Sequence, residues 1–416
     1  MAELYKLAFR NVFRNRRRSI ITLSAIALGL LSLVVTQGMM NGLGKQSELN
    51  IINYDTGHLK IYRIGFTDDN AGFDLEKTIT DPGGIVTELE RLPEIKAATG
   101  RIIFPALVIH RGESMPAIAT GIDLKNDGRV FSLAETVTEG RFLKPGDKGV
   151  LVGEKLANVF GIKPGDEIIL QARTRAEADE ISPIQALDLE VVGIISTGNP
   201  KIDGLNLFLP LSLTQESMRM PNMVTDISLR LSSLRFLARV EKEINSRLAP
   251  GEFEVNTWID LAQSFLSLHR LKKTGSMIFL AIFVIITAVG IVNTMLMASF
   301  ERTNEIGMMA ALGMKAKEIR RLFLLEGGIL GAMGSGIGVF IGSIITYLGE
   351  VYGIDLTAIY GDVDMGYPIR GYWYTDLTVG LVISSLLFGI IISVLASYYP
   401  AQRAARKEPT EALRHV

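Results

Sequence analysis

The side chains that could perform catalysis are few and lie far apart in the sequence. The chain has 416 residues, no cysteine and four histidines, which are His58, His110, His269 and His415. No two of these histidines have the spacing of metal ligands, so zinc or di-metal chemistry is not expected. A chain without cysteine can form neither a disulfide nor a thiolate nucleophile. We therefore predict no catalytic residue and no metal site.

The sequence motifs of ATP binding and of serine hydrolases are also missing. Neither the Gly-x4-Gly-Lys-Ser/Thr loop nor the Gly-x-Ser-x-Gly turn occurs, so this chain is not expected to bind ATP itself. One glycine-rich run lies inside an apolar segment, where phosphate has no access. Its glycines fall into two sets at four-residue spacing, which lets helices approach closely. We expect helix packing at Gly327, Gly331, Gly334, Gly338 and Gly342.

Four long apolar segments predict membrane-spanning helices. A helix needs about 20 apolar residues to cross the hydrocarbon core of a bilayer. The spans are predicted at 19–44, 274–299, 321–349 and 376–399. The expected fold class is an α-helical membrane protein with four transmembrane helices plus an α+β extracytoplasmic domain.

The positions of lysine and arginine predict the orientation of the spans. The segments 1–18, 300–320 and 400–416 are rich in basic residues, whereas 350–375 has Arg370 as its only basic residue. The basic segments are expected in the cytoplasm. The protein is thus predicted to be a multi-pass protein of the inner (cytoplasmic) membrane, with both termini cytoplasmic.

The N-terminal segment 1–18 has the pattern of an amphipathic helix. Apolar pairs recur every four residues, and basic residues occupy the other side; the two sets are Leu4/Tyr5, Ala8/Phe9, Val12/Phe13 and Lys6, Arg10, Arg14, Arg17. Such a helix lies in the inner headgroup layer, where anionic lipid attracts its basic face. The alternative is that these cations serve only to orient the first span.

The large segment 45–273 is expected outside the cytoplasm. Short strand-like runs alternate there with helical patterns, which indicates an α+β domain. We predict an outer lobe built from 45–130 and 206–273, and an inserted β-rich lobe at 131–205. Lys-Pro-Gly-Asp occurs at 144–147 and 163–166, where Gly after Pro favours a type II turn.

Two polar residues lie inside or beside the predicted spans. Asn293, in the second span, could donate a hydrogen bond to a neighbouring helix and joins the predicted packing residues. Glu326 lies at the cytoplasmic start of the third span. An ionisable residue there is a functional candidate, and we favour a structural pair with a nearby basic residue.

The connection between the second and third spans contains a short amphipathic helix. From 301 to 313 it reads Glu-Arg-Thr-Asn-Glu-Ile-Gly-Met-Met-Ala-Ala-Leu-Gly. Ile306, Met309, Ala310 and Gly313 would share one face, and Gly313 would end the helix. A partner protein or the membrane surface could cover this apolar face.

This connection carries a family resemblance. Glu-Arg-x-x-Glu-Ile-Gly-x-x-x-Ala-Leu-Gly at 301–313 resembles the coupling segment of the MacB/FtsX/LolC–LolE superfamily of ABC transporter permeases. The opening at 8–18, the closing pattern at 399–414 and the layout of one span, an outer domain and three further spans are similar too. Because MacB-type proteins carry an ATPase on the same chain and this sequence has none, it most resembles stand-alone LolC/LolE-type lipoprotein-releasing permeases.

The resemblance implies a transport subunit rather than an enzyme. It implies a homodimer, or a heterodimer with a related permease, in which each copy binds a separate ABC ATPase that holds ATP and Mg. Closure of the ATPases would move a two-lobed, Porter/Sabre-like outer domain, which is called mechanotransmission. The segment that would dock on the ATPase comprises Glu301, Arg302, Glu305, Ile306, Gly307, Met309, Ala310, Ala311, Leu312 and Gly313.

The sequence does not identify the substrate that the permease acts on. Release of lipoproteins or another hydrophobic substrate from the inner membrane is the leading hypothesis, with a periplasmic chaperone or adaptor as a further candidate partner. The alternatives are an adaptor-linked, MacB-like efflux permease, an FtsX-like signalling device that activates a cell-wall hydrolase, and a membrane-anchored binding protein without a motor. The net charge of −1 does not indicate a nucleic-acid partner.

Overall fold

The computed structural model describes residues 2–14, 16–66, 73–175, 182–249, 251–355, 367–369 and 371–406. Most of the predicted tail 400–416, and much of the predicted outer connection 350–375, therefore lie outside the described residues. The chain divides into two compact units. Unit 1 comprises 1–44, 268–354 and 373–416, and unit 2 comprises 45–267 and 355–372.

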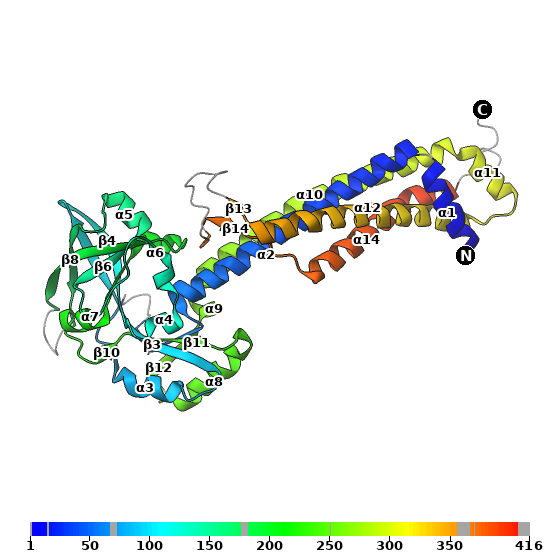
Figure 1. Ribbon diagram of the computed structural model, residues 1–416. Coiled ribbons are helices and arrows are strands. Elements are labelled where there is room, and N and C mark those ends of the chain that lie inside the picture. Colours follow the sequence, from blue (N-terminus) through cyan, green and yellow to red (C-terminus); the bar gives the residue numbers. More distant parts are fainter. Residues whose placement is uncertain are drawn as a thin grey trace. The chain divides into compact units, whose positions relative to one another are not determined.

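Unit 1 is a helical bundle (Figure 1). Its helices are α1 (Ala2–Arg14), α2 (Arg16–Ile51), α10 (Gln263–Glu301), α11 (Thr303–Ala311), α12 (Ala316–Tyr352) and α14 (Val379–Ala405). By length and composition, four of these are apolar enough to cross a bilayer, namely α2 with its continuation to Thr56, α10, α12 and α14. The predicted class of a membrane protein with four spans is confirmed.

The glycines of α12 lie at its contacts with two different helices. A Cβ at Gly334, Gly338 or Gly342 would meet Ile26, Ala27 or Val34, all on α2. At Gly327 or Gly331 it would meet Ser397 or Ser393, both on α14. One helix thus uses two sets of glycines, each at four-residue spacing, to approach two neighbours closely.

Unit 2 is built on a ten-stranded mixed sheet with the order β12-β1-β11-β3-β4-β9-β6-β8-β5, to which β7 adds beside β3 and β8. These strands are β1 (Leu59–Arg63), β3 (Ile95–His110), β4 (Glu113–Ile122), β5 (Val137–Gly140), β6 (Gly149–Gly153), β7 (Glu167–Arg173), β8 (Ile184–Ile195), β9 (Asn206–Pro210), β11 (Asp226–Leu231) and β12 (Phe253–Thr257). Four further strands of two residues each form two separate pairs, β2 (Ile79–Thr80) with β10 (Met223–Val224), and β13 (Ile354–Asp355) with β14 (Tyr372–Trp373).

Short helices accompany the sheet of unit 2. They are η1 (Ile52–Thr56), α3 (Pro82–Leu89), α4 (Asp127–Val130), η2 (Leu133–Thr136), α5 (Glu154–Phe160), α6 (Pro200–Leu205), α7 (Leu211–Ser217), η3 (Leu234–Phe236), α8 (Leu237–Arg247) and α9 (Trp258–Leu261). The mixture of helices and sheet confirms the predicted α+β class of this domain.

Strand β3 is the element that joins the sheet together. Its first half, from Ile95 to Arg101, pairs with β11. Its second half pairs with β7 on one edge and with β4 on the other. Strand β4 continues through β9 to β6, so the strands of 131–205 join the outer strands in one sheet.

The two Lys-Pro-Gly-Asp segments form the predicted turns. Gly146 has a φ of 86° and Gly165 a φ of 94°, which is the left-handed conformation that glycine adopts without strain. The amide of Asp147 donates to the carbonyl of Lys144 at 3.1 Å, and that of Asp166 to Lys163 at 3.0 Å. Both features expected of a type II turn are thus present, namely the hydrogen bond that closes the turn and the positive φ of its glycine.

A buried histidine makes the stability of unit 2 depend on pH. His58 is 7% exposed, and its Nδ1 accepts a hydrogen bond of 2.7 Å from the amide of Leu231. Burial and the nearby Arg230 guanidinium lower the pKa of His58 from 6.5 to about 4. The unfolded chain therefore binds more protons between these two values. The stability that neutral His58 provides is fully present above about pH 6.5 and is lost as the pH falls toward 4.

We expect the hydrogen-exchange protection of the Leu231 amide to fall by roughly 100-fold between pH 7 and pH 4, after correction for intrinsic exchange, because lowering the pKa of His58 from 6.5 to about 4 corresponds to about 3 kcal/mol. Exchange measured by mass spectrometry on the full chain in detergent reports this change. The variant His58→Asn retains a side-chain acceptor that does not titrate, so it should lose the pH dependence. An equally steep dependence in His58→Asn would exclude His58 as its cause.

Candidate functional site

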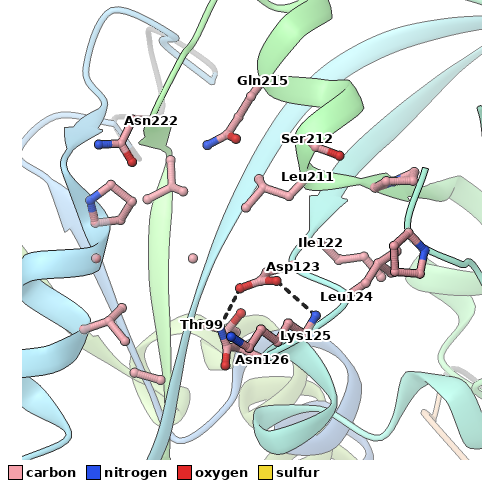
Figure 2. Close-up of a pocket in the computed structure, with 18 of the residues that line it drawn as sticks. Thr99, Ile122, Asp123, Leu124, Lys125, Asn126, Leu211, Ser212, Gln215 and Asn222 are labelled. Atoms are coloured by element: carbon pink, nitrogen blue, oxygen red, sulfur yellow. Dashed lines mark hydrogen bonds between the residues drawn. The ribbon is translucent and has the colours of Figure 1, made fainter. Parts of the chain in front are cut away.

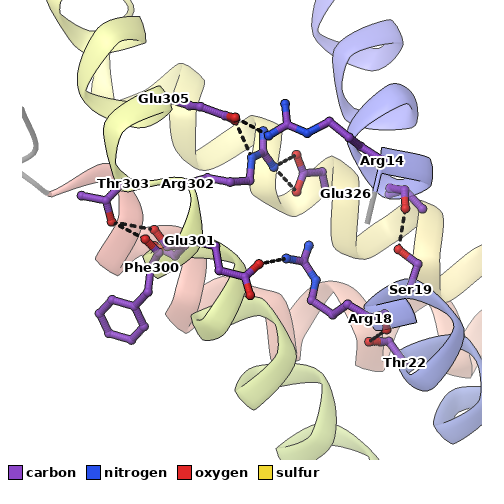
Figure 3. A network of polar contacts seen from close by, with 12 residues as sticks. Arg14, Arg18, Ser19, Thr22, Phe300, Glu301, Arg302, Thr303, Glu305 and Glu326 are labelled. Carbon is purple, nitrogen blue, oxygen red and sulfur yellow. Dashed lines mark hydrogen bonds and ion pairs between the residues drawn. The ribbon is translucent and has the colours of Figure 1, made fainter. Parts of the chain in front are cut away.

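A polar network lies at the junction of α10 and α11 in unit 1 (Figure 3). We call Asn11, Arg14, Arg302, Glu305 and Glu326 the carboxylate network. They come from α1, from the residue between α10 and α11, from α11 and from α12. Three segments that are distant in sequence thus meet at two carboxylates.

Glu326 is the buried member of the carboxylate network. Its carboxylate is 2% exposed and accepts hydrogen bonds from Asn11 Nδ2 at 2.7 Å and from Arg302 Nη1 at 3.0 Å. The predicted pairing of Glu326 with a nearby basic residue is confirmed. A buried carboxylate without a cationic partner is very costly, so the Arg302 guanidinium is needed to keep Glu326 buried as a carboxylate.

Arg302 connects the buried carboxylate to α11. Its side chain is 7% exposed, and its Nε donates to Glu305 Oε2 at 2.9 Å. Glu305 also accepts from Arg14 Nη2. Partial burial alone would raise the pKa of the Glu305 carboxyl, but the hydrogen bonds from Arg14 and Arg302 hold this pKa below its ordinary value. Glu305 is thus a carboxylate at neutral pH, and it ties α11 to α1.

A second ion pair lies beside the network. Arg18 Nη1, on α2, is 3.6 Å from Glu301 Oε2, on the last residue of α10 (Figure 3). Glu301 is 45% exposed at its side chain, so this pair contributes little to stability by itself. It adds a contact between α2 and the end of α10.

The helix α11 buries one face against its own bundle. Ile306 is 1% exposed and belongs to the core of unit 1, and Met309 and Ala310 pack against the same core. Gly307 is buried as well. The sequence suggested a partner protein or the membrane surface as the cover for this face. The structure shows that the chain's own helices cover it, because Ile306 lies in the core that the helices of unit 1 share.

The opposite face of α11 is free of such contacts within unit 1. Asn304, Met308, Ala311 and Leu312 are exposed, and Met308 and Leu312 are 52% and 89% exposed. Gly313 follows with a φ of 94°, which confirms that this glycine ends the helix. We call Asn304, Met308 and Leu312 the exposed stripe of α11.

Asn293 lies on an exposed part of α10 among the described residues, so its role in helix packing stays a prediction. Sequence reasoning missed Asn11 and Arg14 as parts of the site. Arg14 was interpreted only as part of the orientation signal and of the amphipathic pattern, and Asn11 was assigned no role. Their three-residue spacing, which places both on one helix side, was the available signal.

A groove in unit 2 is a separate candidate for binding (Figure 2). It has a volume of about 490 Å³ and lies between α3, α7 and the end of β4. Asp123 at its rim is held by the amide of Lys125 at 3.0 Å and by Asn126 Nδ2 at 2.7 Å. The buried Thr99 hydroxyl in its wall has no hydrogen-bond partner among the described residues. The groove offers mainly apolar surface and backbone, which suits an apolar or extended segment.

Within the described residues, no group of three or more His, Asp or Glu side chains is arranged to hold a metal ion. The placement of ATP and Mg on a partner chain stays a prediction.

Four bilayer-length helices with an α/β domain between the first and second define an integral membrane protein with a large non-membrane domain. Comparison with known proteins places the chain more narrowly. The model of the MacB-like periplasmic core domain matches residues 19–247, and that of the FtsX-like permease C-terminal domain matches 277–409. Because the first match alone covers more than half of the chain, the protein belongs to the MacB/FtsX-type family of ABC transporter permeases.

Individual relatives extend over nearly the whole chain. The lipoprotein-releasing system transmembrane protein LolC of Xylella fastidiosa is 26% identical over 407 residues, which cover 95% of this chain and 94% of that protein. An uncharacterized ABC transporter permease of Bacillus subtilis, YknZ, is 23% identical and covers 100% of this chain and 99% of its own. The crystal structure of the periplasmic region of MacB from Actinobacillus actinomycetemcomitans matches 52% of this chain and 95% of its own, at 15% identity and a TM-score of 0.37.

Proposed function

We propose that this permease couples ATP hydrolysis on a separate ATPase subunit to movements of unit 2, and that it thereby releases lipoproteins or another hydrophobic substrate from the inner membrane. The observation that carries the proposal is the two-sided character of α11. One face is fixed to the spans through Ile306 and Arg302, and the other presents the exposed stripe. A helix built in this way can receive a push from a partner and transmit it to the bundle.

The ATPase would bind the exposed stripe of α11 in the cytoplasm. Met308 and Leu312 supply exposed apolar surface of the kind that the core of an interface buries. The predicted coupling segment 301–313 therefore divides into two parts. One part holds α11 to unit 1 and comprises Arg302, Glu305, Ile306, Gly307, Met309 and Ala310. Glu301 pairs with Arg18 on α2. The other part, Ala311, Leu312 and Gly313, is exposed and available to a partner.

We expect the double variant Met308→Asp/Leu312→Asp to weaken binding of the ATPase by at least about tenfold, because two apolar anchors are replaced by charges that resist desolvation. The measurement is the amount of ATPase that co-purifies with tagged permease from native membranes. Both side chains are exposed, so the permease should still insert and fold. The matched control is Val159→Asp, which alters a 68% exposed apolar residue of unit 2. Unchanged co-purification of the double variant would contradict the docking assignment.

A second permease copy is part of the proposal. Helix α10 has only 6% of its most apolar window buried within the chain, and Asn293 lies exposed on it. An amide facing hydrocarbon is costly without a hydrogen-bond partner, so a partner from outside this chain would satisfy it. Whether the second copy is identical or a related permease is an outcome of the experiment below.

The cargo is supported by the relatives named as parts of lipoprotein-releasing systems, which match nearly all of this chain. Affinity purification from native membranes, followed by mass spectrometry, tests this part of the proposal. A soluble ATPase together with lipoproteins is the expected result. An ATPase with a periplasmic adaptor would favour the MacB-like efflux function, and a cell-wall hydrolase would favour FtsX-like signalling. Recovery of no ATPase in mild detergent would contradict the transport function itself.

A further inference from the structure

Helix α1 presents three different faces. Ala8 and Val12, 0% and 3% exposed, belong to the core of unit 1, which places one face against the bundle. Tyr5, Phe9 and Phe13 form a second face, which we call the aromatic stripe, and they are 56%, 48% and 45% exposed. Residues four apart lie on one side of a helix, and the rings of Phe9 and Phe13 are 4.9 Å apart at their centroids.

The third face of α1 carries cations at the same spacing. Lys6, Arg10 and Arg14 follow one another every four residues and are exposed, and we call them the basic stripe. On a helix with 3.6 residues per turn, each basic residue lies about 100° around the axis from its aromatic neighbour. The two stripes therefore run side by side along the helix.

An anionic phospholipid surface is the partner that fits both stripes. Aromatic rings settle at the boundary between headgroups and acyl chains, while lysine and arginine attract anionic headgroups. The helix is followed almost at once by α2, which begins at Arg16 and is long and apolar enough to cross a bilayer. The stripes are therefore tethered at the membrane surface, where headgroups are abundant.

The basic stripe ends at the carboxylate network. Arg14, its last member, donates to Glu305 on α11 (Figure 3). The two side chains are 56% and 34% exposed, and a pair as exposed as this contributes little to stability. A lipid phosphate offers the same guanidinium several charge-assisted hydrogen bonds. Glu305 would keep its bond to Arg302, so the loss of Arg14 releases α11 from α1 without leaving a carboxylate unpaired.

We propose that anionic phospholipid is a regulatory ligand of this permease. Headgroups bound along Lys6, Arg10 and Arg14 compete with Glu305 for Arg14 and free α11 from α1. The regulatory part rests on the proposed role of α11 in coupling and on the proposed cytoplasmic orientation of α1. The fraction of anionic lipid in the adjoining leaflet would then determine how easily α11 moves with the bound ATPase.

Hydrogen exchange on the full-length permease, without any ATPase, tests the proposal. The permease is placed in nanodiscs of phosphatidylcholine alone or of phosphatidylcholine mixed with phosphatidylglycerol. In the anionic discs we expect exchange in α1 to slow by at least about fivefold, since a single cation near an anionic surface already contributes about this factor. We expect exchange in α11 to accelerate by about threefold, the size of an exposed ion pair.

Three variants separate the steps of the proposal. Lys6→Gln/Arg10→Gln should remove both responses, because both changed side chains lie on the basic stripe and outside the carboxylate network. Arg14→Gln should leave α11 exchanging fast in both kinds of disc. The control Lys317→Gln/Arg321→Gln removes two exposed cations of α12 and should keep both responses.

Other outcomes would overturn the proposal. Equal exchange in the two lipids would exclude anionic lipid as a ligand of α1, and slower exchange in α11 would mean that lipid tightens the contact with α1. Loss of the responses in the α12 control would make them a general charge effect. Protection of α1 that appears only after the ATPase is added would assign this face to the ATPase. A failure of the ATPase docking assignment would show instead in the co-purification of the Met308 and Leu312 variant.

Discussion

Replacement of Arg302 by methionine will lower the free energy of unfolding of the helical unit by about 3–5 kcal/mol, because it leaves the Glu326 carboxylate buried without its cation. Glu326 is 2% exposed and, among the described residues, would retain Asn11 Nδ2 as its donor. Denaturant titration in detergent, followed by circular dichroism, measures this loss. Hydrogen exchange in α11 should rise as well, since Arg302 also holds Glu305.

A second change should reverse most of this effect. In Arg302→Met/Glu326→Gln the buried charge is removed, and the amide oxygen of the new side chain can still accept from Asn11. Most of the lost stability should therefore return. The matched control is Arg321→Met, an exposed arginine of α12, which should change stability by less than about 0.5 kcal/mol. A loss in Arg302→Met no larger than that of the control would show that the pair with Glu326 contributes nothing.

Prediction from sequence succeeded for elements whose structure is determined by residues close together in the chain. The four spans follow from length and apolarity alone, and the two Lys-Pro-Gly-Asp turns follow from the φ preferences of proline and glycine. The run Asp226–Leu231, in which apolar and polar residues alternate, is one of the strand-like runs of 45–273, and it forms β11 with these bounds. These signals depend on residues that are near each other in the chain.

The strands that were missed have no such signal. Strand β4, Glu113–Ile122, contains Pro116, three alanines or glycines and few branched residues, so its sequence resembles a loop. It forms a strand because β3 pairs with it from Arg101 to His110 and β9 pairs on its other edge. Tertiary pairing overrides a weak local propensity here.

The same limit applies to the candidate site. A basic partner for Glu326 could be expected from the cost of a charge in a span. The identity of the partner could not, since Arg302 is one of several nearby cations and Asn11 lies 315 residues away. The burial of one face of α11 could not be predicted either, because Ile306 packs into a core to which five other helices contribute residues.

Substitution of Gly338 by alanine will lower the stability of the helical unit by about 3 kcal/mol, against the usual effect of this change. In the interior of a helix, alanine in place of glycine ordinarily stabilises by about 1 kcal/mol. At Gly338, however, the added Cβ would lie 2.3 Å from the carbonyl oxygen of Ala27 and 2.8 Å from its Cα. Backbone atoms cannot rotate away as a side chain can, so α2 and α12 must move apart and lose the packing between them.

Gly336 provides the control on the same turn of the same helix. A Cβ at Gly336 meets nothing within 4 Å, so Gly336→Ala should raise stability by up to about 1 kcal/mol through helix propensity alone. The two variants make the same chemical change, and they differ only in the helix face on which it falls. Opposite signs in a denaturant titration would assign the glycine spacing of α12 to its contact with α2. If both variants stabilise the protein, α2 does not approach α12 at Gly338 as closely as the structure has it, and the glycines need another explanation.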